Sequence, residues 1–98
     1  MERARAERIA GVLKAIADPT RLQLLHLIQS APDGEACVGD LTERLGLRQP
    51  TVSHHLKTMT AAGLLARERR GTWVWYSVDP DGMEAVREIL RAPARTAS

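Results

Sequence analysis

The residues best suited to chemistry lie in the segment Arg48–Ala62, where polar and apolar side chains recur with the period of a helix. Gln49, Ser53 and Lys57 would share one face with Thr60. The positions expected on a largely apolar face are Val52, His55, Leu56 and Met59. Glutamine can form two hydrogen bonds with adenine, serine can donate or accept, and lysine can reach a phosphate. The spacing therefore predicts a helix that reads a DNA major groove, although a polar face open to water would have the same pattern.

A basic hairpin follows this helix. Two extended runs, Leu65–Arg70 and Thr72–Val78, meet near Gly71 and predict a pair of strands with a tight turn. The arginines at or near the turn suit the DNA backbone or a narrow minor groove. A polar helix followed by a basic hairpin favours DNA binding over a merely solvated surface. The predicted DNA contacts are Arg48, Gln49, Pro50, Thr51, Ser53, His54, Lys57, Arg67, Arg69 and Arg70.

The rest of the chain predicts the scaffold that positions these residues. Asp18 and Asp79 each precede a proline, which is the pattern of a helix cap followed by the first helical residue. Besides the segments above, we expect helices over Glu2–Ala17, Pro19–Ser30 and Asp40–Leu45, a very short strand over Glu35–Val38, and a last helix from Pro80. This order predicts a mainly α fold with a β-hairpin wing, the winged helix-turn-helix.

Length and composition limit the possibilities further. The 98 residues carry a formal charge of +2 and one cysteine, so we expect one domain over residues 1–92, a frayed tail over 93–98 and no internal disulfide. We also expect a cytoplasmic protein, because a single cysteine suits a reducing compartment. We expect no membrane segment, because no apolar run approaches the length of a spanning helix. No glycine-rich phosphate loop or nucleophilic triad is recognisable, which argues against an enzyme.

The first and last helices each carry an aliphatic stripe. A monomer of this size could not cover both stripes, so we expect a homodimer joined through these two helices. The predicted dimer contacts are Ile9, Val12, Leu13, Ile16, Met83, Val86, Ile89 and Leu90.

Several motifs resemble one family in the same order along nearly the whole chain. Those motifs are Ala17–Leu22, Val38–Leu41, Gly46–Lys57, Ala62–Leu64 and Arg69–Tyr76, which are similar to the ArsR/SmtB repressors. The resemblance implies a homodimer that binds an imperfect palindrome in double-stranded DNA, represses transcription and is released by an inducer, usually a metal or metalloid. It also implies that Gln49, Ser53 and His54 read bases. Arg48 replaces a serine common in the family, so a helix cap is lost and a phosphate contact becomes available.

The inducer site is where the resemblance weakens. Many family members carry a Cys-x-Cys pair where this chain has Cys37-Val-Gly39, so the usual three-cysteine arsenic site is not supported. Weak metal candidates are Cys37, Asp81, Glu84 and Glu88, and we expect Cys37 to be a small buried apolar residue. We expect His26 to be partly buried rather than a ligand. The inducer could instead be a small molecule, a redox change at Cys37 or a protein partner. A second alternative concerns the whole fold, because a winged helix can also serve as a protein-interaction module.

Overall fold

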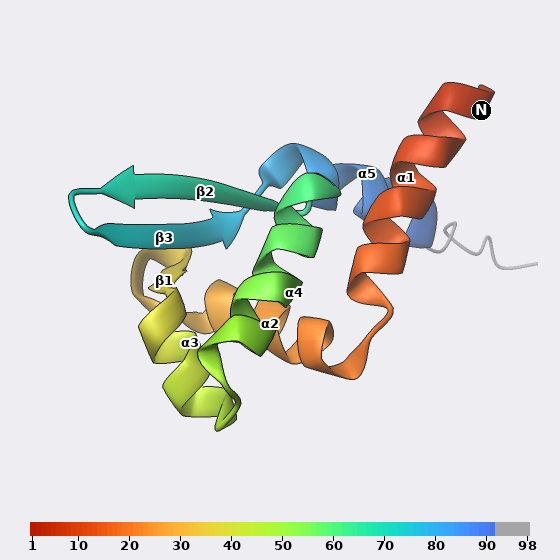
Figure 1. Cartoon of the computed structure of the whole chain (residues 1–98). Helices are drawn as coiled ribbons and strands as arrows, with labels where there is room; N and C mark the ends of the chain where they lie inside the picture. The colour runs from red at the N-terminus through yellow and green to blue at the C-terminus, as the bar shows by residue number, and fades with distance from the viewer. Residues whose placement is uncertain (92–98) are drawn as a thin grey trace, which may run out of the picture.

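The computed structural model describes residues 1–91 and contains five helices and three strands in that range (Figure 1). The elements are α1 (Arg3–Ile16), α2 (Pro19–Ser30), β1 (Glu35–Cys37), α3 (Val38–Leu45), α4 (Gln49–Ala61), β2 (Leu65–Arg70), β3 (Trp73–Val78) and α5 (Pro80–Leu90), with a 3₁₀ turn at Pro32–Gly34. The order and types agree with the winged helix-turn-helix expectation. The predicted frayed tail at 93–98 lies outside the described residues.

Local chemistry fixes the ends of the helices. The carboxylate of Asp18 accepts a hydrogen bond from the Arg21 backbone N–H, and that of Asp79 accepts one from the Asp81 N–H. Both aspartates are therefore N-caps followed by proline, as the sequence predicted. Gly46 ends α3 with a positive φ of 65°, a conformation that glycine adopts without strain.

Several element boundaries differ from the expected ones. Helix α1 is one residue shorter at each end, Arg3–Ile16 rather than Glu2–Ala17. Helix α3 begins at Val38 rather than Asp40, which shortens β1 to Glu35–Cys37. Strand β3 begins at Trp73 rather than Thr72, because Gly71 and Thr72 form the turn of the wing. These shifts of one or two residues move no predicted site residue to a different element.

The three strands form one antiparallel sheet with β3 in the middle and β1 and β2 at its edges. Arg67 lies opposite Tyr76, Arg69 opposite Val74 and Arg70 opposite Trp73. On the other side of β3, Glu35 lies opposite Ser77. This register determines which face of the wing each charged side chain occupies.

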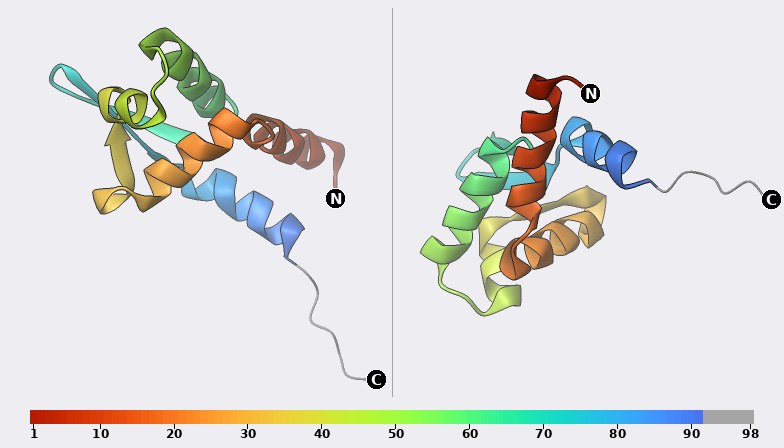
Figure 2. Two further views of the ribbon diagram at one scale, coloured as in Figure 1. Left: turned by 90° about the horizontal axis from the view of Figure 1, so that it is seen from below. Right: turned by 90° about the vertical axis from the view of Figure 1, so that its right-hand side faces the viewer.

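One hydrophobic core holds the helices against the sheet. Its fully buried members come from α2, α3, α4 and the turn before β2: Leu24, Ile28, Leu41, Val52, Leu56, Met59 and Leu64. The wing projects at one end of the subunit, while α1 and α5 lie together at the other end (Figures 1 and 2). The core therefore fixes α4 between the wing and the two terminal helices.

Candidate nucleic-acid interface

Helix α4 has one buried and one exposed face, as its sequence period predicts. Val52, Leu56 and Met59 are completely buried in the core. The exposed side chains of the helix include five of the predicted DNA contacts, Gln49, Pro50, Thr51, His54 and Lys57, and Ser53 is half-buried. The polar side chains are therefore available to a ligand, while the buried ones anchor the helix.

The N-terminal end of α4 is open. Arg48 occupies the N-cap position but forms no side-chain cap hydrogen bond, which confirms that the cap is lost. Arg48 and Gln49 are both exposed there. The free amide dipoles of a helix start attract negative charge, so an exposed arginine beside them adds to a positive region.

The strand register places two of the wing arginines on the same face as α4. Side chains directly opposite each other in an antiparallel pair share a face, and successive side chains alternate between faces. Arg67 is paired with Tyr76, which is buried in the core, and Arg69 is paired with half-buried Val74. Arg67 and Arg69 therefore lie on the face of the wing that carries α4.

A hollow of about 640 Å³ separates α4 from the wing. Ser53 and Lys57 line it from the helix, and Arg67 lines it from β2. The other residues that line it are Val38, Thr60, Ala61, Val74 and Tyr76. Two cationic side chains thus border a concave surface that is next to the exposed face of α4.

Arg70 lies on the reverse face of the wing. Its Nη1 and Nη2 donate to the two carboxylate oxygens of Glu35 at 2.7 and 2.8 Å, and its Nε donates to Glu68 Oε1 at 2.9 Å. The guanidinium also covers the ring of Trp75, with 5.4 Å between its central carbon and the ring centroid. Arg70 is therefore the predicted wing contact that the structure directs away from α4.

These contacts shift the protonation of the groups involved. The hydrogen bonds from Arg70 lower the pKa of Glu35 and the pKa of Glu68, so both carboxylates stay ionised. The same two partners raise the pKa of Arg70 above its ordinary value. Sequence reasoning missed Glu35, because no local pattern connects it with an arginine 35 residues away.

The predicted dimer contacts divide into two groups. Ile9, Val12 and Val86 are buried within the subunit, where α1 and α5 pack against each other. Their role in a dimer stays a prediction. Leu13, Ile16 and Met83 are partly buried against the core. Ile89 and Leu90 remain 43% and 67% exposed at the end of α5.

The weak metal candidates do not come together within a subunit. Among residues 1–91, no three His, Cys, Asp or Glu side chains are placed to hold one metal ion. Cys37 is buried beside Trp73 and Trp75, and burial raises the pKa of its thiol. On α5, Glu84 forms an ion pair with Arg87 at 3.8 Å and Asp81 occupies the first turn.

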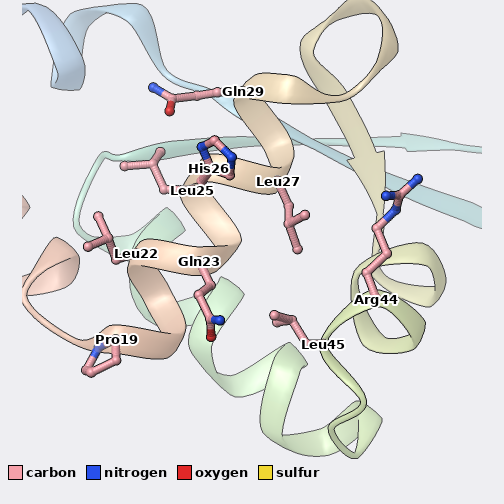
Figure 3. A pocket seen from close by; sticks show the side chains of 9 residues that line it. All are labelled: Pro19, Leu22, Gln23, Leu25, His26, Leu27, Gln29, Arg44 and Leu45. Atoms are coloured by element: carbon pink, nitrogen blue, oxygen red, sulfur yellow. The ribbon is translucent and has the colours of Figure 1, made fainter.

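A second hollow lies between α2 and the end of α3 (Figure 3). Its volume is about 770 Å³, and Leu22, Leu25, Leu27 and Leu45 supply most of its apolar lining. His26 is exposed at this surface, so the expected partial burial of that residue is wrong. None of the predicted DNA contacts lines this hollow.

The three-stranded sheet, the helix-turn-helix formed by α3 and α4, and the exposed polar face of α4 define a winged helix-turn-helix DNA-binding transcription regulator rather than an enzyme. The model of the bacterial regulatory protein family arsR matches residues 18–67, which is just over half of the chain. The chain therefore belongs to the arsR family. None of the helices among residues 1–91 is long and apolar enough to cross a membrane.

Individual transcription regulators are similar to this chain in sequence or in structure. An uncharacterized HTH-type transcriptional regulator of Methanocaldococcus jannaschii is 39% identical over 87% of this chain and 90% of its own length. The arsenic resistance transcriptional regulator ArsR1 of Pseudomonas putida is 41% identical over 82% of this chain, which spans 61% of that regulator. A homodimeric winged helix-turn-helix DNA-binding domain from Mycobacterium bovis superimposes with a TM-score of 0.74 at 29% identity, covering 88% of this chain and 78% of that one.

Proposed function

We propose that the chain is a cytoplasmic homodimeric repressor that binds an imperfect palindromic operator through α4 and the wing and is released by an inducer. The observation that supports this proposal is the hollow between α4 and the wing. Lys57 and Arg67 border it from two elements, beside the exposed polar side chains of α4. A DNA strand leaving the major groove would enter such a hollow with its phosphates near both cations.

Different residues would have different tasks at this surface. Gln49, Ser53 and His54 would contact base edges, because they are short polar groups near the start of the helix. Phosphate contacts would come from the cations around them, Arg48, Lys57, Arg67 and Arg69, with Pro50 and Thr51 packing on the backbone at the helix start. Arg70 would contribute little, because two carboxylates already neutralise its guanidinium.

A dimer would present two copies of α4 to successive major grooves. Ile89 and Leu90 offer exposed apolar surface at the end of α5, and the Mycobacterium bovis neighbour is homodimeric. Half-sites would then be about one helical turn, roughly 34 Å, apart. Light scattering at micromolar concentration should show a dimer, and a monomer would remove the argument for a palindromic operator.

The inducer should not be one that needs three thiolate ligands. Each subunit supplies one cysteine, and that thiol is buried. A panel of metals and arsenite, scored by both protein binding and release of DNA, should therefore show no tight stoichiometric arsenite complex. The variant Cys37→Ser is included in the panel. An inducer that does not use the thiol should release this variant from DNA as readily as it releases wild-type protein.

Selection from a random duplex pool tests the reading of DNA. Wild-type protein should enrich one family of palindromic duplexes. The substitution Gln49→Ala should weaken binding to these duplexes by about 1–3 kcal/mol per half-site, whereas the variant should bind unrelated duplexes as wild type does. Gln29→Ala, which changes an exposed glutamine on α2, is the matched control. Equal losses from both substitutions, or enrichment of no sequence by the wild type, would contradict direct readout and favour a protein-interaction module.

A further inference from the structure

Arg21 lies between the end of α1 and the inner side of α4, two elements that the proposed function uses separately. Its Nε donates to the Ala15 carbonyl at 2.7 Å, and its Nη2 donates to the Lys14 carbonyl at 3.2 Å. Its Nη1 lies 3.4 Å from Nδ1 of His55, a half-buried residue of α4. One guanidinium therefore contacts three residues on two helices besides its own.

The contacts with α1 complete the hydrogen bonding of that helix. The last four carbonyls of a helix lack partners within it unless following residues supply them. The Ala17 N–H binds the Leu13 carbonyl and the Asp18 N–H binds the Ile16 carbonyl, which leaves those of Lys14 and Ala15. Arg21 satisfies both, and its positive charge faces the negative end of the helix dipole.

The contact with α4 has a defined direction. Arginine carries only donors, so Nη1 is the donor in this contact, and Nδ1 of His55 is the acceptor in the tautomer whose proton is on Nε2. The carboxylate of Asp18, which accepts from the Arg21 backbone N–H, is also near this ring. Exposed His54 lies on the same helix, with 6.1 Å between the two ring centroids. Val52 and Leu56 on either side of His55 are buried, so the core holds the backbone of this part of α4 in place.

We propose that Arg21 is a positioning residue for operator binding, which links the end of α1 to His55 and thereby fixes the angle of α4 relative to the dimer axis. This inference rests on the proposed dimeric DNA-binding function. Helices α1, α2 and α4 are in mutual contact, so Arg21 connects elements that already touch (Figures 1 and 2). The thirteen residues of α4 span about 20 Å, and a tilt of roughly 10° would move one end by about 3.4 Å, the rise of one base pair.

Half-site spacing is therefore the informative measurement. The probe is the duplex that wild-type protein selects from a random pool, together with versions in which the half-sites are one base pair closer or farther apart. Wild-type protein should lose affinity steeply for both altered spacings. Arg21→Gln should bind the selected duplex about tenfold more weakly and discriminate less among the three spacings, because α4 can then adopt several angles.

His55 variants separate this role from general stability. His55→Leu keeps an apolar side chain and leaves the α1 carbonyls bonded to Arg21, but it removes the acceptor and should reproduce the loss of spacing discrimination. His55→Asn places an amide oxygen where Nδ1 was and should restore affinity to within about twofold of wild type. Arg3→Gln, at an exposed arginine of α1 paired with Glu7, is the control for the charge change and should bind as wild type does.

The double variant Arg21→Gln/His55→Leu tests whether the two residues act together. It should bind no more weakly than the weaker single variant, since either change breaks the same contact. Additive losses, unchanged spacing discrimination in His55→Leu, or equal losses on unrelated DNA would overturn the positioning role. If wild-type protein selects no duplex, the proposed function fails first and this inference fails with it.

Discussion

The salt dependence of DNA binding should distinguish Arg67 from Arg70, although the two arginines are three residues apart in one strand. Arg67 borders the hollow beside Lys57, whereas Arg70 is paired with Glu35 and Glu68 on the reverse face of the wing. Each phosphate contact contributes about 0.9 to the slope of log affinity against log salt concentration. Loss of one contact in each of two subunits should therefore reduce the slope by about 1.8.

The change is large enough to measure by fluorescence anisotropy with a labelled duplex. Between 50 and 200 mM salt, the affinity ratio of wild type to Arg67→Gln should narrow by about twelvefold, which is four raised to the power 1.8. Arg70→Gln removes the same formal charge but should change the slope by less than half as much. Equal slopes for the two variants would refute the assignment of faces from the strand register.

An exchange of charges gives a stricter form of the same test. Arg67→Glu combined with Glu68→Arg leaves the composition and net charge of the wing unchanged, but it places a carboxylate in the hollow. This double variant should lose at least the affinity that Arg67→Gln loses. Retention of wild-type affinity would mean that the total charge of the wing, rather than its distribution, controls binding.

Three further predictions concern stability and the buried thiol. A methyl group at Gly82 would overlap the Gly63 carbonyl, so Gly82→Ala should lower the free energy of unfolding, measured in urea, by about 1–3 kcal/mol. Gly39 has open space around it, so Gly39→Ala should change this free energy little. Because Arg70 holds the pKa of Glu35 below its ordinary value near 4.5, the pair stabilises the fold above that pH and the stability is lost as the pH falls through the lowered pKa. Melting temperatures from pH 2 to 6 should therefore fall less steeply for Glu35→Gln than for wild type. Burial raises the pKa of Cys37 above 9.0, so alkylation by iodoacetamide at pH 7.5 should be at least about tenfold slower in native than in urea-unfolded protein, and equal rates would show that the thiol is accessible.

The parts of the fold that the sequence predicts well depend on neighbouring residues. Asp18 and Asp79 cap helices that begin with the following proline, and Gly46 ends α3, because each feature involves only a few consecutive residues. The faces of α4 follow from the helical period in the same way. The boundary between β1 and α3 was less predictable, since Gly39 disfavours a helix and tertiary contacts override that preference.

Features that depend on distant partners could not be predicted. The stripe on α1 shows that Val12 faces something apolar, but the period is the same whether α5 of the same subunit or a second subunit covers it. Likewise, nothing near Arg21 indicates that its side chain contacts His55, which is 34 residues away. The sequence period identifies the apolar face of a helix, but only the packed fold shows which residues contact that face.

The wing shows the same distinction within a single strand. Its segment Arg67–Arg70 contains three arginines and one glutamate, and a uniform basic tip would be the simplest interpretation. Strand alternation instead places Arg67 and Arg69 on the face with α4, while Arg70 and Glu68 fall on the other face with Glu35. The two carboxylates are thereby kept away from the hollow, and one arginine holds the hairpin to β1. A chain with a net charge of only +2 can thus gather cationic side chains on the face of the wing beside α4, because its acidic side chains on the wing are paired on the opposite face.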